Sequence, residues 1–242
     1  MTDTARVLVV IPAYNEAPSL EGVIRGVRAA VPEATVAVVN DGSTDATGAV
    51  GERLGAVVLH LSHNMGIGVA EQTGLQFALR AGYDLVVRAD GDGQHEATDV
   101  SRLVDTLRTT GADLVIGSRY LTPGGYRTSR PRRLASAVLN VAVRAACGAS
   151  ITDPTSGFRA FGPRAIRLCA RLHPFDYPEP ESVVLLVRAG LHVRELPVTM
   201  HPRQSGRSSI SVARSVYYMV KVLLAIGVGV LRRGPSLPPE CG

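Results

Sequence analysis

Residues 6–42 read RVLVVIPAYNEAPSLEGVIRGVRAAVPEATVAVVNDG, and this stretch decides the fold. The apolar, β-branched run over residues 6–11 predicts a buried strand. Apolar side chains then recur at the spacing of one helix face over residues 17–31. A second strand is predicted over residues 35–39, where Asn40-Asp41-Gly42 stops it. Strand, helix and strand in this order are typical of the crossover unit of a parallel sheet.

The alternation continues to about residue 116 and predicts an α/β domain. Three further strands are expected over residues 56–61, 84–89 and 113–116, and three helices over 45–54 (with Asp45 as N-cap), 66–81 and 98–109. The sheet should be mainly parallel, with helices on both faces, as in Rossmann-like folds. In such sheets ligands bind beyond the carboxyl ends of the strands, so the polar residues there are the first candidates for a site.

The second half of the chain is less regular. We expect helices over residues 134–147 and 181–189, an extended segment over 191–200, a polar insertion at 153–159, and loops rich in Gly, Pro and Arg at 121–133 and 201–209. We divide the chain into a catalytic domain, residues 1–209, and a C-terminal apolar helical segment, residues 210–242.

Composition narrows the class of partner. The 242 residues are 45% hydrophobic and carry a net charge of +5, which favours a phosphate-bearing ligand, nucleic acid or a membrane surface. Aromatic residues make up only 5% and Trp is absent, so we expect no nucleic-acid partner. The three cysteines are scattered along the chain, which predicts free thiols in a reducing compartment. The chain does not start with a charged stretch followed by an apolar one, so we expect no secretory signal and a cytoplasmic protein. A homo-oligomer is left open.

The strongest chemical signal is Asp90-Gly-Asp92-Gly-Gln94-His95, directly after the fourth predicted strand. In an extended segment, residues two apart point to the same side with their Cα atoms about 6.6 Å apart. Asp90 and Asp92 can then hold one Mg²⁺ or Mn²⁺, with Gln94 adding a neutral oxygen. His95 is a weaker candidate, and the alternative for the whole motif is a solvated turn.

Two other strand-end loops carry polar groups. Tyr14 can stack on a base, Glu16 can accept from a ribose hydroxyl, and Asp41 can accept from a base N–H. The alternative is that both loops hold only turn and cap residues. A dinucleotide site is disfavoured, because no Gly-x-Gly-x-x-Gly follows the first strand.

Arginines and two glutamates complete the candidates. Arginine forks match phosphate oxygens, and those near the strand ends and in the two basic loops form a possible phosphate clamp: Arg119, Arg127, Arg130, Arg132, Arg133, Arg203 and Arg207, with Ser208 beside them. Any one of them can instead be a surface charge. Glu179 and Glu181 either start a helix as dipole-complementing acids or face an acceptor.

These motifs, in their order, resemble the inverting glycosyltransferase family 2, which includes dolichyl- and polyprenyl-phosphate mannose or glucose synthases. The resemblance covers residues 7–210 and rests on Ile11–Glu16, Asn40–Asp45, Asn64-x-Gly66, Asp90–His95, Gly117–Arg119, Asp153–Arg159 and Arg203-x-x-Gly206-x-Ser208. It implies the glycosyltransferase A-type fold, a nucleotide diphosphate sugar donor and a divalent metal. Carried over by position, Pro12, Tyr14, Glu16 and Asp41 hold the nucleotide, and Arg119, Arg132 (or Arg133) and Arg203 contact phosphates.

The expected reaction is displacement at the anomeric carbon with inversion. A cation and arginines neutralise the leaving nucleoside diphosphate, and Asp92 and Arg119 are the candidate catalytic groups. A lipid phosphate acceptor is already ionised and needs no base, whereas a hydroxyl acceptor would need Glu179 or Glu181. The alternatives are a hydroxyl-acceptor transferase, a non-catalytic nucleotide-sugar binding protein and a nucleotidyltransferase, the last disfavoured because no Gly-rich triphosphate loop is present.

The C-terminal segment suggests where the protein works. The apolar run over residues 216–231 would be about 24 Å long as a helix, short of a hydrocarbon core of about 30 Å. Lys221 interrupts it, and Arg232-Arg233 close it. We therefore expect an interfacial helix that places the protein on the cytoplasmic membrane face, with a core helix as the alternative.

Overall fold

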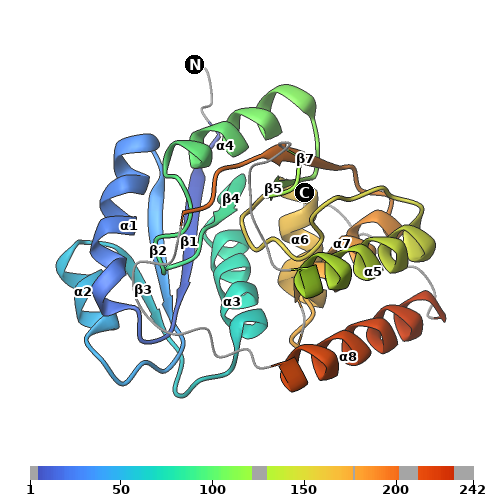
Figure 1. Cartoon of the computed structure of the whole chain (residues 1–242). Helices are drawn as coiled ribbons and strands as arrows, with labels where there is room; N and C mark the ends of the chain where they lie inside the picture. The colour runs from blue at the N-terminus through green and yellow to red at the C-terminus, as the bar shows by residue number, and fades with distance from the viewer. Residues whose placement is uncertain (1–4, 122–129, 177, 202–211, 232–242) are drawn as a thin grey trace.

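The computed structural model describes residues 5–121, 130–176, 178–201 and 212–231 (Figure 1), and of residues 130–135 and 212–218 it describes the backbone alone. The elements of the first half are β1 (Val7–Ala13), α1 (Ala17–Ala30), β2 (Thr35–Asn40), α2 (Thr47–Arg53), β3 (Val57–His60), α3 (Ile67–Arg80), β4 (Leu85–Arg88), α4 (Thr98–Thr110) and β5 (Leu114–Ser118). Those of the second half are α5 (Arg130–Cys147), β6 (Arg159–Phe161), α6 (Pro163–Leu172), α7 (Pro178–Arg188), β7 (Val193–Pro197) and α8 (Val212–Leu231).

The described strands form one mixed sheet in the order β3-β2-β1-β4-β6-β5-β7. Every pairing is parallel except the two made by β6, which runs antiparallel to both β4 and β5. The segment before β6 starts at the carboxyl edge of β5, where Asp153 contacts Arg119, so the strand that follows must run back across the sheet. The expected mainly parallel sheet is confirmed, with this one reversed strand.

The sheet separates two hydrophobic cores. Along β1, Leu8 and Val10 face one core, and Val9 and Ile11 face the other, as the two-residue period of a strand requires. The helices α1, α2 and α4 cover one face, and α3 with α5, α6, α7 and α8 covers the other. Both faces of the sheet are therefore buried, which explains the near-continuous apolar runs of its strands.

Two local predictions are wrong, and one helix was not predicted. The loop expected over residues 121–133 is wrong at its end, because residues 130–133 already form the first turn of α5, where Pro131 needs no N–H partner. Asp45 is not the N-cap of α2, which is Ala46, although the Asp45 carboxylate accepts from the backbone N–H of Thr47 at 2.9 Å. The helix α6 lies outside the predicted elements.

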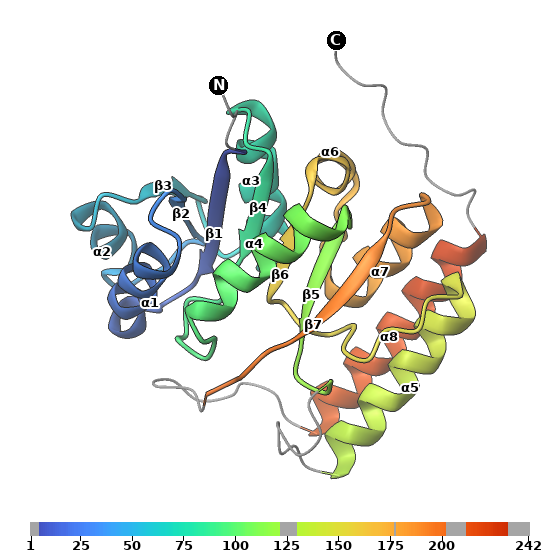
Figure 2. The same cartoon turned by 90° about the horizontal axis from the view of Figure 1, so that it is seen from above.

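The C-terminal helix packs against the rest of the domain. In both views α8 lies alongside α5 (Figures 1 and 2), and it also contacts α7. Val222 and Ile226 point into the core on the α3 side of the sheet, whereas Leu224 and Val228 on the opposite side of α8 are exposed. Within the described residues, every helix is too short or too polar to span a bilayer. The division of the chain at residue 209 stays a prediction.

The close packing of α3 on β1 gives a test of this arrangement. A Cβ on Gly74 would lie 2.4 Å from Cγ1 of Val10, a stiff side chain in the middle of the sheet. Overpacking costs about 1–3 kcal/mol, and the helix propensity of Ala returns at most about 1 kcal/mol. We expect Gly74→Ala to lower the free energy of unfolding by about 1–2 kcal/mol in urea titrations.

Gly22 is the matched control, since it also lies inside a helix but a Cβ there meets nothing within 4 Å. We expect Gly22→Ala to stabilise the protein by about 0.5–1 kcal/mol. Equal effects of the two substitutions would contradict the packing described for α3.

Candidate active site

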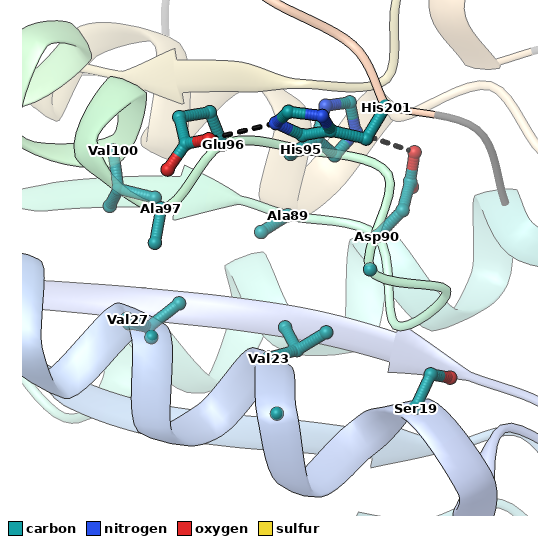
Figure 3. Close-up of a pocket in the computed structure, with 13 residues that line it drawn as sticks. Ser19, Val23, Val27, Ala89, Asp90, His95, Glu96, Ala97, Val100 and His201 are labelled. Carbon is teal, nitrogen blue, oxygen red and sulfur yellow. Dashed lines mark hydrogen bonds and ion pairs between the residues drawn. The ribbon is translucent and has the colours of Figure 1, made fainter. Parts of the chain in front are cut away.

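The loop that follows β4 separates two cavities. The larger, of about 620 Å³, opens at the carboxyl edge of the sheet, and the smaller, of about 380 Å³, lies on the side of α1. Figure 3 shows the smaller cavity, with Val23 and Val27 of α1 facing Ala97 and His95. Asp90 and His95 line both cavities, so the loop over residues 90–95, called the acidic loop below, forms the wall between them.

The larger cavity brings together most of the predicted site residues. They come from the ends of β1, β2, β4 and β5 and from the start of α7, five places far apart in the chain. The predicted residues that line it are Pro12, Tyr14, Glu16, Asp41, Asp90, Asp92, Gln94, Arg119 and Glu179. The cavity therefore lies at the edge at which parallel strands end, where the sequence predicts a ligand site.

The loops after β1 and β2 are tied to each other. Asn15 adopts a left-handed backbone with φ of 55°, and its side-chain oxygen accepts from the backbone N–H of Thr44 at 2.8 Å. Ser43 in turn accepts from the backbone N–H of Asn15 at 3.0 Å. Tyr14 beside it is 44% exposed, which leaves its ring available to a ligand. The two loops thus present one rigid surface.

Asp41 holds part of the cavity wall in place. It is buried, and its two carboxylate oxygens accept from the backbone N–H groups of Met65 at 2.7 Å and Gly66 at 3.0 Å. These bonds hold the turn before α3 against the end of β2. The expected contact between Asp41 and a base N–H stays a prediction, and such a contact would have to use the remaining lone pairs.

The acidic loop is held by partners on several sides. Asp90 accepts from Arg88 at 2.8 Å and pairs with Nε2 of His95 at 2.9 Å, and the His95 ring stacks on Phe158. Burial raises the pKa of Asp90, but the charge of Arg88 and the bond to His95 outweigh burial and hold that pKa well below its usual range. Asp90 is therefore ionised at neutral pH.

Asp92 and Gln94 are also positioned. Asp92 is buried and accepts from the backbone N–H of Gln94 at 3.1 Å. The side-chain nitrogen of Gln94 donates to the carbonyl of His201 at 3.2 Å, which joins the acidic loop to the segment after β7. Among the described residues no three His, Cys, Asp or Glu side chains form a metal-binding group. A cation here would take two protein carboxylates and would need its other oxygens from a ligand or water.

Arg119 is held by a buried acid. Its Nε and Nη2 donate to the two oxygens of Asp153, each at 2.7 Å, and Nη2 also donates to Thr155 at 2.8 Å. This bidentate pair fixes the guanidinium plane at the edge of the cavity. The predicted phosphate contact of Arg119 stays a prediction, and a phosphate would have to share the fork with Asp153.

The two glutamates at the start of α7 have different surroundings. Glu179 lines the larger cavity and accepts from Arg88 at 3.2 Å. Glu181 is not among the residues that line it, and burial together with the nearby Asp176 raises the pKa of Glu181. The structure does not describe Arg127, Arg203, Arg207 or Ser208, and it describes only the backbone of Arg130, Arg132 and Arg133, in the first turn of α5.

One residue at the centre of the site was missed. Arg88 ends β4, and its side chain is almost fully buried beside Asp90 and Glu179. Its signal in the sequence is a single charge inside the apolar run of residues 85–89, where a buried strand has no place for an unpaired charge. Other residues of the cavity that were not predicted are Thr155, Ser156, Gly157 and Met200.

Comparison with known proteins gives a consistent result. Residues 8–167 match the family described as glycosyl transferase family 2. The chain is 36% identical over 235 residues to the polyprenol monophosphomannose synthase of Mycolicibacterium smegmatis, covering 90% of this chain and 86% of that protein. It is 37% identical over 216 residues to the undecaprenyl-phosphate mannosyltransferase of Micrococcus luteus, covering 85% and 88%.

The fold also matches solved structures. Glucosyl-3-phosphoglycerate synthase from Mycobacterium tuberculosis, in complex with Mn²⁺, uridine-diphosphate-glucose and phosphoglyceric acid, superposes with a TM-score of 0.71 at 24% identity. The match covers 92% of this chain and 80% of that one. This likeness confirms the expected glycosyltransferase A-type fold.

The pair of Arg119 and Asp153 should be a main stabilising contact of the site. Asp153→Ala removes the fully buried carboxylate that pairs with Arg119, and breaking a buried pair in this way costs about 3–5 kcal/mol. We expect a loss of that order in urea unfolding. Glu21→Ala removes an acid from exposed pairs with Arg25 and Arg53 and should leave the midpoint almost unchanged. Similar small losses for both variants would contradict a structural role for Asp153.

Proposed function

The chain belongs to glycosyl transferase family 2, and we propose that it transfers a hexose, mannose in the first instance, from a nucleotide diphosphate sugar to a polyprenyl phosphate. One observation carries the proposal. Nine predicted site residues from five separate places meet in one cavity around Asp90 and Asp92. They do so in a chain that is 36% and 37% identical to a polyprenol monophosphomannose synthase and an undecaprenyl-phosphate mannosyltransferase.

The donor side of the cavity suits a nucleoside diphosphate with a divalent cation. Tyr14 offers a ring face for a base, and Glu16 and Asp41 offer carboxylate oxygens beside it. Asp90 and Asp92 are the residues that would hold Mg²⁺ or Mn²⁺, and two carboxylates leave positions for diphosphate oxygens. When bound, the cation supplies positive charge that offsets the charge developing on the leaving diphosphate.

The acceptor side favours a phosphate over a hydroxyl. A hydroxyl acceptor needs a base, but Glu179 is hydrogen-bonded to the guanidinium of Arg88, and Glu181 lies away from the cavity lining. A phosphate acceptor is already largely ionised at neutral pH and can attack without losing a proton. Arg119 at the edge of the cavity is suited to orient such an anion. Attack from the side opposite the leaving group inverts the anomeric carbon.

An apolar ridge on α5 and α8 supports a location of the protein at a membrane surface. On α8, Val220, Leu224, Val228 and Leu231 recur at helical spacing and are all at least half exposed, and Val141 of α5 is 69% exposed. We propose that this ridge lies on the cytoplasmic membrane face, where the acceptor phosphate sits at the headgroup level. The helices α5 and α8 contact each other and lie side by side (Figure 2).

The transfer reaction is tested directly with a panel of nucleotide sugars, with and without undecaprenyl phosphate, and products identified by mass. We expect a lipid-linked hexose only when Mg²⁺ or Mn²⁺ is present, and no product after EDTA. Asp92→Asn keeps the shape and removes the charge, and it should cost roughly 10²-fold in rate, because cations stabilise transition states by several kcal/mol.

Asp105→Asn on the exposed side of α4 is the matched control and should retain full rate. Full activity of Asp92→Asn or in EDTA would remove the cation from the mechanism. Product only with sugar hydroxyl acceptors would support the alternative of a polysaccharide or natural-product transferase. Binding of nucleotide sugars with no transfer to any acceptor would support a non-catalytic binding protein.

The membrane proposal has its own test. We expect the protein to sediment with vesicles that contain phosphatidylglycerol and to be released by alkaline carbonate. Leu224→Glu and Val141→Glu should each weaken vesicle binding about tenfold or more, because each replaces an apolar side chain worth about 1.5–3 kcal/mol when buried.

Leu79→Glu is the control, since Leu79 is exposed on α3, away from the ridge. If the protein ignores the vesicles and both ridge variants behave like the wild type, the ridge is not a membrane contact. The ridge would then be a candidate contact between copies of the chain.

A further inference from the structure

A single buried guanidinium joins three elements beneath the site. The Arg88 side chain is 4% exposed and lies near three carboxylates. Nη2 is 2.8 Å from Asp90 in the acidic loop, Nη1 is 3.2 Å from Glu179 at the start of α7, and Nε is 3.6 Å from Glu71 on α3. Through these ion pairs Arg88 links the acidic loop to α7.

The surrounding chain leaves room for this guanidinium. A Cβ on Gly157 would lie 2.0 Å from Nη1 of Arg88 and 2.5 Å from its Cζ. Real atoms essentially never approach so closely, so a Cβ at this position would force the end of the Arg88 side chain to shift. The backbone of the segment before β6 therefore acts as one wall of the slot that holds Arg88.

The carboxylate of Glu71, which lies behind Arg88, is also held in its charged form. Burial would raise the pKa of Glu71, but the charges of His173 and Arg88 outweigh burial and hold that pKa at about 2. Glu71 is thus ionised across the physiological range and attracts Arg88 from the side of α3. The guanidinium is held from behind by Glu71 and from the side by Gly157, and it presents its Nη atoms to Asp90 and Glu179.

Asp90 gains a fixed orientation from these contacts. One oxygen accepts from Arg88, and the other pairs with Nε2 of His95. Each carboxylate oxygen has a second lone pair, which remains for a cation. Partners that hydrogen-bond a ligating carboxylate in this way commonly set metal affinity.

We propose that Arg88 is a positioning residue that orients Asp90 for the divalent cation and fixes Glu179 on the opposite wall of the cavity. This inference rests on the proposed function, because it assigns Asp90 to the cation that accompanies the donor. In this role Arg88 touches neither donor nor acceptor. It acts by removing rotational freedom from Asp90 before the cation arrives.

The test measures cation binding rather than activity. Loss of the free-Mn²⁺ paramagnetic resonance signal gives the Mn²⁺ dissociation constant, in separate titrations with uridine diphosphate and guanosine diphosphate. Arg88→Lys keeps a positive charge but loses the planar fork that reaches two carboxylates. We expect the Mn²⁺ dissociation constant to rise about tenfold or more, within the range typical of outer partners of metal ligands.

Gly157→Ala displaces the same guanidinium without changing any charge. The end of the Arg88 side chain is the atom group that must move, so this variant should raise the Mn²⁺ dissociation constant in the same way. Gly162→Ala is the matched control, since a Cβ there meets its nearest atom at an ordinary 3.4 Å, and its dissociation constant should stay within about twofold. Thermal unfolding shows that each variant is folded.

The outcomes separate a positioning role from a structural one. A folded Arg88→Lys or Gly157→Ala protein with wild-type Mn²⁺ affinity overturns the inference and leaves Arg88 as a stabilising residue only. If Arg88→Lys does not fold, Gly157→Ala decides the question. If the wild type binds no Mn²⁺ with either nucleotide, the proposed function fails, and the inference fails with it.

Discussion

A buried positive charge is the constraint on which this site depends. Arg88 ends the central strand β4, where water cannot solvate it, and an unpaired charge there would cost several kcal/mol. Carboxylates from three elements pair with this charge: Glu71, Asp90 and Glu179. In this position the guanidinium also leaves no space for a Cβ on residue 157, which is a glycine. The acidic loop, α3, α7 and the segment before β6 are thereby held in one arrangement.

The second constraint is the shared edge of the sheet. Because β1, β2, β4 and β5 run parallel, their carboxyl ends lie at the same edge, and the loops that follow must face each other. Here the loops after β1 and β2 bond to one another through Asn15, and Asp41 ties the second loop to the start of α3. Hydrogen bonds between side chains and backbone therefore organise the proposed donor surface before any ligand arrives. The acidic loop is held instead by the contacts of Asp90 with Arg88 and His95.

Much of the sheet and of the candidate site could be predicted from the sequence, and the features that could not be predicted share a physical cause. The strands of the first half were predictable because both faces of a parallel sheet are buried and leave continuous apolar runs, and Asp90 and Asp92 stood out as polar groups directly after one of them. The reversed strand β6, the partners of Arg119 and the role of Arg88 were not predictable. Each depends on contacts between residues far apart in the chain, such as Arg88 with Glu179. A lone arginine in an apolar strand was the available clue.

The most direct measurement is a crystal structure of the protein with Mn²⁺ and a nucleoside diphosphate. We predict one ion coordinated by Asp90, Asp92 and diphosphate oxygens in the larger cavity, the base beside Tyr14, and Arg88 still bonded to both Asp90 and Glu179. An ion bound elsewhere, or Arg88 turned away from Asp90 with the ion in place, would contradict it.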